Sequence, residues 1–335
     1  MAPRVVMVQW VPRQPWPLPG SRACLFATGS GTPRALAPRL SLCRPRPRAA
    51  AAQMLVPLAG GGQETLLSEV GFVLLPLFTT AEACALRLVC REFLAAVREH
   101  PWEDRGTVIQ GSIAAWRACF PHARCANVLM WDMNEDEEVV TRGAPVVDAD
   151  FVHFEGLREL YMSDCRDVTD AAFVHLRGIR TLDMSYCNQP AITNAAFAHL
   201  AGIQRLSIWA CHQATITDAA FAHLRGIQLL NMSRCTQLTD AAFVHLRGIH
   251  TLYMWCCNQP AITDAAFTHP RGIHTLVLHA CDQANITGVN FTHLQGIQSL
   301  NMLSCRDDQV ATARSLGLPV TVENPKSYGA LHWTY

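Results

Sequence analysis

The chain has 335 residues, of which 50% are hydrophobic and 16% charged, so it can bury one large core or two modest ones. Its longest apolar run, residues 70–78, is far shorter than the ~20 residues of a membrane-spanning helix, which argues against a membrane protein. The net charge of zero combines eight Arg and no acidic residue in residues 1–63 with 19 basic and 27 acidic residues in the remainder. This acidic remainder would repel phosphates, which argues against a nucleic-acid-binding protein.

Residues 1–63 are rich in Arg, Pro and Ala, and we expect them to form a disordered extension. Two alternatives are an organelle transit peptide and a stretch that lies upstream of the true translation start at Met54. No secretory signal pattern is visible. We therefore expect a cytoplasmic and/or nuclear protein without disulfides.

Residues 64–104 carry apolar side chains at helical spacing. Leu66, Leu67 and Val70 fit an amphipathic helix that Pro76 interrupts. Thr79 or Thr80, with Glu82 behind it, can cap a second helix that ends at Pro101. The apolar stripe of this second helix comprises Leu86, Val89, Cys90, Phe93, Ala96 and Val97. The pattern predicts a small helical hairpin.

Residues 105–146 are expected to form a linker and an N-terminal cap. Within them, residues 113–120 have a helical pattern, and residues 128–133 have the pattern of a strand that could be a degenerate first repeat. The acidic run at residues 135–138 is expected to be a solvated loop.

A repeat dominates residues 147–305. Seven segments of the type GIRTLDMSYC recur at steps of 22 or 24 residues, separated by a second block of the type TDAAFVHL. A period of 20–29 residues with this spacing of hydrophobic residues is typical of leucine-rich repeats. The sequence therefore predicts a solenoid of the α/β class, with a curved parallel sheet on one side and short helices outside it.

The pattern of one unit predicts its local structure. Leu182 and Met184 are two residues apart and should lie on one side of a short strand. Phe173 and Leu176 are three apart and should share the buried face of a helix. The Gly two residues after that Leu suits a left-handed helix end. A Thr stands at the expected helix N-cap of six units: Thr169, Thr193, Thr217, Thr239, Thr263 and Thr287.

Two slots of the unit hold potential metal ligands. One slot always holds Cys (Cys165, Cys187, Cys211, Cys235, Cys257, Cys281 and Cys305), and another always holds His (His153, His175, His199, His223, His245, His269 and His293). Zinc sites use close pairs such as C-x2-C, and none occurs here. We therefore predict a ladder of buried thiols that donate weak hydrogen bonds to loop carbonyls, with no metal and no cofactor. Residues 306–335 lose the repeat and are expected to form a C-terminal cap and tail.

The cysteine slot followed by I-T-D resembles the cysteine-containing subfamily of leucine-rich repeats over about residues 147–305. In that pattern Pro270 replaces a Leu, and Gly288 replaces the usual Asp. The stretch LRLVCREF, with PW some eight residues later, resembles an F-box, the adaptor-binding motif of cullin-RING ubiquitin ligases. This second resemblance covers roughly 40 residues and lacks the usual Leu-Pro opening. It implies docking of an SCF adaptor protein, and through it a cullin, on Leu66, Leu67, Val70, Leu86, Val89, Cys90, Phe93 and Trp102. The alternative is that these helices merely cap the solenoid.

Two strand positions that flank the invariant Leu vary along the array and are expected to face outward. Large aromatic residues and Arg are typical of binding hot spots, and they gather in the third to fifth units. We therefore expect a protein target to bind at Tyr161, Asp183, Arg205, Trp209, Arg234, Tyr253, Trp255 and His279. The alternative is that the aromatic side chains pack on one another or under the C-terminal tail.

No nucleophile-base-acid set, phosphate-binding glycine loop or metal pair stands out, so we do not expect an enzyme. The leading hypothesis is the substrate receptor of a ubiquitin ligase, which presents an unidentified protein target and contacts neither nucleic acid nor membrane. The second is an interaction scaffold without ligase association. A third is a binder of small molecules or nucleic acid that uses the same face of the sheet.

Overall fold

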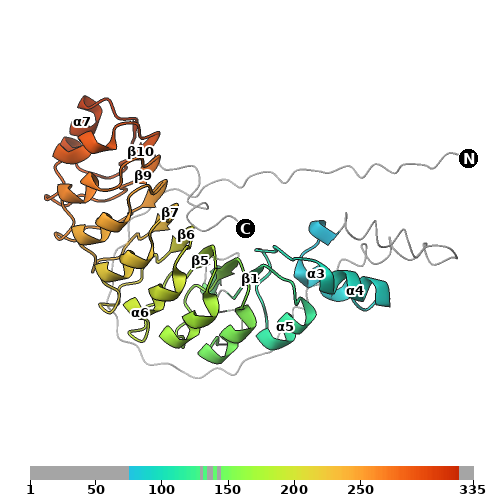
Figure 1. Cartoon of the computed structure of the whole chain (residues 1–335). Coiled ribbons are helices and arrows are strands. Elements are labelled where there is room, and N and C mark those ends of the chain that lie inside the picture. The colour runs from blue at the N-terminus through green and yellow to red at the C-terminus, as the bar shows by residue number, and fades with distance from the viewer. Residues whose placement is uncertain (1–74, 129–130, 134–138, 142–144, 324–335) are drawn as a thin grey trace, which may run out of the picture. The chain divides into compact units, whose positions relative to one another are not determined.

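A computed structural model of the chain describes residues 75–128, 131–133, 139–141 and 145–323 (Figure 1). The predicted N-terminal extension and the predicted adaptor contacts Leu66, Leu67 and Val70 lie outside the described residues. None of the helices in the described part is long and apolar enough to span a bilayer.

One parallel sheet of nine strands runs through the described part in the order β1-β4-β5-β6-β7-β8-β9-β10-β11. The strands follow in chain order, and the invariant Leu residues are in register, as at Leu160, Leu182 and Leu206. This order requires every unit to cross over on the same side of the sheet, and Figure 1 shows the helical segments stacked along that side. The strands are β1 (Cys125–Asn127), β4 (Glu159–Tyr161), β5 (Thr181–Asp183), β6 (Arg205–Ser207), β7 (Leu229–Asn231), β8 (Thr251–Tyr253), β9 (Thr275–Val277), β10 (Ser299–Asn301) and β11 (Val320–Thr321).

The sheet is one strand longer at each end than the seven predicted repeats. The strand expected at residues 128–133 as a degenerate first repeat is wrong in its position, because the first strand of the parallel sheet is β1, which ends at Asn127. Its second half is instead β2 (Trp131–Met133), which pairs antiparallel with β3 (Val139–Thr141) in a separate two-stranded sheet. At the other end, α7 (Asp307–Ser315) and β11 continue the repeat geometry where the sequence pattern has faded.

The predicted short helices on the crossover side are mostly 3₁₀ helices (η). A 3₁₀ helix places residues i and i+3 directly above one another, so Phe173 and Leu176 both point into the core and are at most 2% exposed. The segments are η3 (Asp148–Phe154), η4 (Asp170–Leu176), α6 (Asn194–Phe197) continued by η5 (Ala198–Leu200), η6 (Asp218–His223), η7 (Asp240–His245), η8 (Asp264–Thr268) and η9 (Val289–Leu294).

The predicted Thr caps are confirmed in five of the six units. In each of these the Thr hydroxyl accepts a hydrogen bond from the backbone N–H two residues later. The same Thr is also bound to the preceding unit: Thr193 donates its N–H and hydroxyl to Asp170 at 2.7 and 2.6 Å. The capping residue therefore joins neighbouring units as well as starting a helix.

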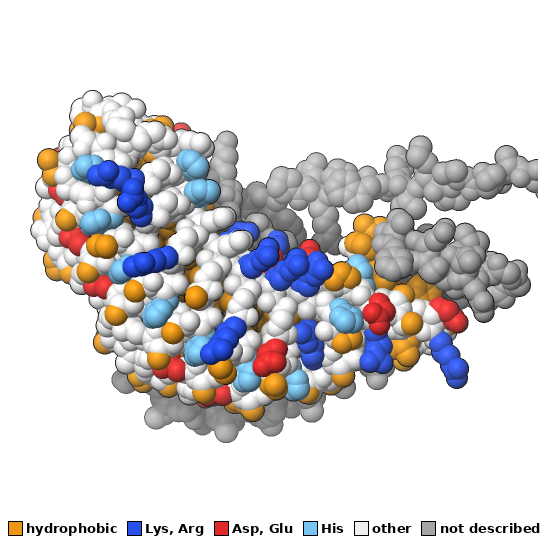
Figure 2. All heavy atoms as spheres, in the orientation of Figure 1, with side chains coloured by type: hydrophobic (Ala, Val, Ile, Leu, Met, Phe, Trp, Pro, Cys, Tyr) orange, Lys and Arg blue, Asp and Glu red, His pale blue; other side chains and the backbone are white. Residues whose placement is uncertain are grey.

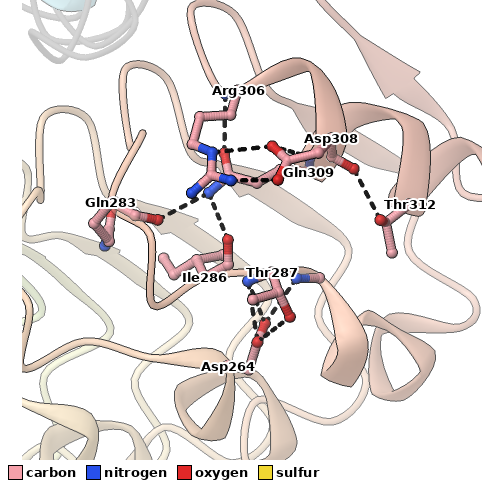
Figure 3. A network of polar contacts seen from close by, with 9 residues as sticks. Asp264, Gln283, Ile286, Thr287, Arg306, Asp308, Gln309 and Thr312 are labelled. Carbon is pink, nitrogen blue, oxygen red and sulfur yellow. Dashed lines mark hydrogen bonds and ion pairs between the residues drawn. The ribbon is translucent and has the colours of Figure 1, made fainter.

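Thr287 is the exception, and its predicted role as N-cap is wrong. Gly288 is the N-cap of η9 and has a left-handed φ of 85°. Asp264 accepts hydrogen bonds from the N–H groups of both Thr287 and Gly288 (Figure 3). A side chain at Gly288 would also lie 3.0 Å from the Thr312 methyl group, which accounts for the Gly at this one position.

The cysteine ladder is confirmed. The thiols from Cys187 to Cys305 each donate to a carbonyl of the preceding unit, as Cys211 does to Met184 at 3.2 Å. The residue before each ladder Cys has a φ of 53–60°, although none of the seven is Gly. In the first six of these bends the N–H of that residue donates to the next unit, as Tyr186 does to Trp209 at 2.8 Å, so hydrogen bonding between units holds the bend.

The N-terminal helices are η2 (Leu75–Leu77), α3 (Thr80–Leu86), α4 (Arg91–Glu99) and α5 (Ile113–Cys119). The capping box of Thr79 and Glu82 is confirmed, and α5 matches the predicted helix at residues 113–120. The single helix expected from Thr79 to Pro101 is wrong, because the chain turns between Arg87 and Cys90. The Cys90 sulfur accepts the N–H of Phe93 at 3.5 Å and starts α4 anew.

Candidate functional site: the strand face and the N-terminal helices

The first outward column of the sheet is largely buried, contrary to expectation. Tyr161 is 1% and Asp183 3% exposed. Tyr161 donates its hydroxyl to Glu159 at 3.0 Å, and Asp183 accepts the N–H of Ser185 at 3.0 Å. The expectation that Tyr161 and Asp183 are exposed on the outward face is therefore wrong, and their contact with a target stays a prediction.

The second column and the bend beside it together form a row of rings. We call Tyr186, Trp209, Trp255 and His279 the aromatic row. The ring centroids of Tyr186 and Trp209 are 4.9 Å apart, those of Trp209 and Trp255 6.2 Å, and those of Trp255 and His279 5.4 Å. Trp209, Trp255 and His279 are half-buried, so their rings pack on one another and still present a surface.

The two Trp rings stack because a small residue lies between their units. Ser233 occupies the same slot in the intervening unit, is 1% exposed, and accepts the N–H of Trp255 at 3.0 Å. The planes of Trp209 and Trp255 are inclined by 28°. A larger residue at Ser233 would separate the rings, so the alternation of Trp and Ser builds the row.

Arg234 completes one edge of the aromatic row. Its guanidinium carbon lies 4.8 Å from the centre of the Trp255 ring, a cation–π distance. Arg234 is exposed, and its left-handed φ of 59° belongs to the bend before Cys235. At the far end, burial lowers the pKa of His279, which favours the neutral imidazole. The row thus combines apolar rings with one exposed cation.

Tyr186 was missed by the sequence analysis. It occupies the slot before the ladder Cys, which looks like a loop position because its residues share no chemical type. The left-handed φ of 60° turns its ring toward Trp209. The sequence did contain a signal for this slot, because Arg234, a predicted target-binding residue, occupies the same slot in a later unit.

Arg205 and Tyr253 lie on β6 and β8, shortly before Trp209 and Trp255 in the chain. Arg205 is the first residue of β6 and lies close enough to Tyr253 for its charge to lower the tyrosine pKa, which burial raises overall. Both side chains are half-buried. Ring and cation–π contacts thus bring together Trp209, Arg234, Trp255 and His279 of the predicted target site. Arg205 and Tyr253 interact with each other.

The N-terminal helices bury part of the stripe that was expected to face a partner. Leu86 is 6% and Trp102 1% exposed, in a cluster with Leu75, Val97 and Phe120. The Trp102 indole N–H donates to the Val97 carbonyl at 2.8 Å. Leu86 and Trp102 are therefore buried and support the packing of these helices, and their contact with an adaptor stays a prediction.

An apolar patch remains exposed on the same helices. Leu88 is 84%, Val89 54% and Leu94 36% exposed, and Cys90 and Phe93 are half-buried. Leu88 and Val89 stand in the turn between α3 and α4, which brings them to the surface. The adaptor-binding role of Val89, Cys90 and Phe93 stays a prediction.

The described residues contain no group of three or more His, Cys, Asp or Glu that could hold a metal ion. Burial raises the pKa of the ladder thiols, for example that of Cys165 to about 12, whereas a metal ligand must be a thiolate. The histidines of the His slot are half-buried or exposed, and His175 pairs with Glu155 at 2.7 Å.

We expect Cys211→Ser to lower the free energy of unfolding by about 1–2 kcal/mol, because a more polar hydroxyl replaces a thiol in a bend that is 0% exposed. Urea denaturation measures the loss. Cys84→Ser, at an exposed position, is the control and should leave the midpoint unchanged. One zinc ion per chain by elemental analysis would contradict the packed-thiol interpretation.

No protein-family model and no curated protein matches the chain. Among solved structures, the chain is similar to the TLR13–ssRNA13 complex (18% identity, 66% of this chain and 29% of that chain, TM-score 0.47). It is also similar to the Rad7–Elc1 complex of yeast (17% identity, 43% and 42%, TM-score 0.35) and to human 5T4 (17%, 64% and 79%, TM-score 0.41). The chain thus spans less than half of the matched chains in the first two. Its own 22–24-residue units, each adding one strand to a parallel sheet, define it as a leucine-rich-repeat solenoid.

Proposed function

We propose that this chain is the substrate-recognition subunit of an SCF-type E3 ubiquitin ligase. In this proposal the N-terminal helices dock the adaptor protein, the strand face binds the target protein, and the chain itself catalyses nothing. Ubiquitin transfer would belong to partner enzymes, and this chain would contribute proximity.

The observation that carries the proposal is the coexistence of two separate surfaces of different chemistry. The F-box-like stretch presents exposed Leu88, Val89 and Leu94, a type of surface that soluble proteins use for partners. The aromatic row with Arg234 has the composition of a protein-binding hot spot. A receptor subunit needs two such surfaces, because it must hold adaptor and target at once.

A second candidate is an interaction scaffold without ligase association. The burial of Leu86 and Trp102 favours it, since these two residues were expected to contact the adaptor. Their cluster with Phe120 and Ala123 also fits helices that cap the solenoid. Direct binding to the adaptor separates the two candidates.

We expect Val89→Asp to reduce co-purification with the SCF adaptor by at least about tenfold, because the change places a charge in the exposed apolar patch, where its desolvation would oppose docking. Val244→Asp is a matched control, because Val244 is 53% and Val89 54% exposed and Val244 lies in η7 of the array. If the wild-type chain fails to co-purify with the adaptor, or if Val89→Asp binds it as well as Val244→Asp does, the scaffold is the better description.

A further inference from the structure

A band of arginines lies where the strands of the first units begin. We call Arg124, Arg158, Arg180 and Arg205 the arginine edge. The first three precede β1, β4 and β5 at the same position of the unit, and Arg205 opens β6. Backbone bonds hold them in register: Arg158 N–H donates to the Arg124 carbonyl at 2.7 Å, and Arg180 N–H to the Arg158 carbonyl at 2.8 Å.

The arginine edge is confined to one end of the array. The same position of the later units holds Gln204, Gln228, His250, His274 and Gln298. Like charges at facing positions of adjacent strands repel one another, so we expect Arg158 and Arg180, on successive strands, to repel each other in the free protein. The later units form the same sheet with Gln or His at this position. An arginine at this position is therefore not required for the strands to pair.

The carboxylates near this edge already have partners. Arg105 binds both oxygens of Glu159, each at 2.6 Å, and Arg124 binds Glu103 at 3.2 Å. The guanidinium groups of Arg158 and Arg180 are exposed and make no hydrogen bond or ion pair within the described part of the chain. Burial lowers the pKa of Arg205, and the charge of Arg105 adds to this effect. The guanidinium groups of Arg158 and Arg180 are therefore left to bind a ligand.

These arginines surround a cavity. Its volume is about 240 Å³, and its lining includes Arg124, Arg158, Arg180 and Arg205 together with Glu103 and Glu159. Figure 2 shows a dense group of basic side chains in the region where Figure 1 labels β1 and β5. The volume is below the range of about 300–1,000 Å³ that holds a whole small-molecule ligand. It suits one functional group at the end of a larger molecule.

We propose that the cavity of the arginine edge binds a phosphoryl group. A guanidinium presents its N–H donors as a fork that fits the oxygens of a phosphoryl group, and a phosphoryl dianion can engage two such forks at once. The group can come from a phosphorylated side chain of a protein or from a free phosphorylated molecule. A nucleic-acid backbone fits less well, because the edge ends after three rungs and residues 64–335 carry a net charge of −8.

The test uses the full-length chain and fluorescence anisotropy with a labelled five-residue peptide of alanines around one phosphoserine. We expect saturable binding that Arg158→Gln/Arg180→Gln weakens by at least about tenfold. Arg225→Gln/Arg247→Gln removes the same charge from exposed turns of the array and should retain wild-type affinity within about twofold. Inorganic pyrophosphate is titrated in parallel. Tighter binding of pyrophosphate than of the peptide indicates a free ligand, and tighter binding of the peptide indicates a protein-borne phosphate.

Melting at low ionic strength gives an independent readout that needs no ligand. Because Arg158→Gln/Arg180→Gln removes repulsion across the strands, it should melt no lower than the wild type. The proposal is overturned if neither phosphate probe binds, if both double variants lose affinity equally, or if an unphosphorylated peptide with Glu at the central position binds equally well. Tighter binding of a single-stranded oligonucleotide would also overturn it. Adaptor co-purification of Arg158→Gln/Arg180→Gln should be unchanged, so failure here is distinct from failure of the proposed ligase role.

Discussion

Replacing Phe243 by Ala is expected to lower the free energy of unfolding by about 3–5 kcal/mol. Phe243 is 0% exposed, and its ring centroid lies 6.4 Å from that of Phe267 in the next unit. The substitution leaves a cavity between two units in the middle of the array, where neighbouring units depend on each other for burial. Such a loss is a large share of the 5–15 kcal/mol that stabilises a typical domain.

Val244→Ala provides the control within the same η7 segment, because Val244 is 53% exposed. A surface change of this kind should stay within about 0.5 kcal/mol. Urea denaturation followed by circular dichroism compares the two variants with the wild type. A midpoint for Phe243→Ala that matches that of Val244→Ala would show that this Phe slot is not part of the core.

The buried positions of the unit were predictable because the same apolar residues recur there in unit after unit. Leu182, Met184 and Phe173 recur at fixed spacing, and a side chain buried between identical neighbours has no freedom to vary. The type of helix was not predictable in the same way. TDAAF fits α and 3₁₀ geometry equally well, and the unit adopts mostly 3₁₀ turns, with Phe173 above Leu176 toward the core.

The break between α3 and α4 was hidden because its residues also fit a helical stripe. Val89 and Cys90 have helical spacing from Leu86, yet Val89 is exposed and Cys90 caps α4. A Cys sulfur is a weak acceptor and is not among the residues preferred as N-caps. The end strands β1 and β11 were missed for another reason, since their segments lack the cysteine slot and part of the leucine pattern while the backbone still pairs.

The strand face was only partly predictable. Because successive side chains of a strand point to opposite faces, the sequence correctly identifies which side chains point away from the core. It does not show whether those side chains are exposed to solvent. Tyr161, Asp183 and Ser185 leave the core side of the sheet, yet all three are buried. Trp209 and Trp255 leave it in the same way and are only half-buried. Exposure on this face therefore depends on packing across neighbouring units, which a sequence read one unit at a time does not reveal.

The aromatic row gives the second large expected effect. We expect Trp209→Ala/Trp255→Ala to weaken target capture by at least ~2 kcal/mol, or about 30-fold in Kd. The stack of the two rings, inclined by 28°, offers a preformed aromatic surface, and removal of both rings also leaves Arg234 without the cation–π contact that positions it. Quantitative recovery of co-purified proteins from cell extract measures the effect, with the adaptor in the same sample as internal standard.

Val174→Ala/Val244→Ala is the matched control, because both residues are exposed on the helical side, at 41% and 53%, and should leave recovery unchanged. If the rings serve only to pack on one another, we expect the opposite result for both the unfolding midpoint and the recovery of the target. The unfolding midpoint of Trp209→Ala/Trp255→Ala would then fall, because stacked aromatic pairs contribute about 0.5–1.5 kcal/mol beyond the area they bury, while target recovery relative to the adaptor stayed at the wild-type level. A variant that keeps its midpoint and loses the target assigns the aromatic row to recognition.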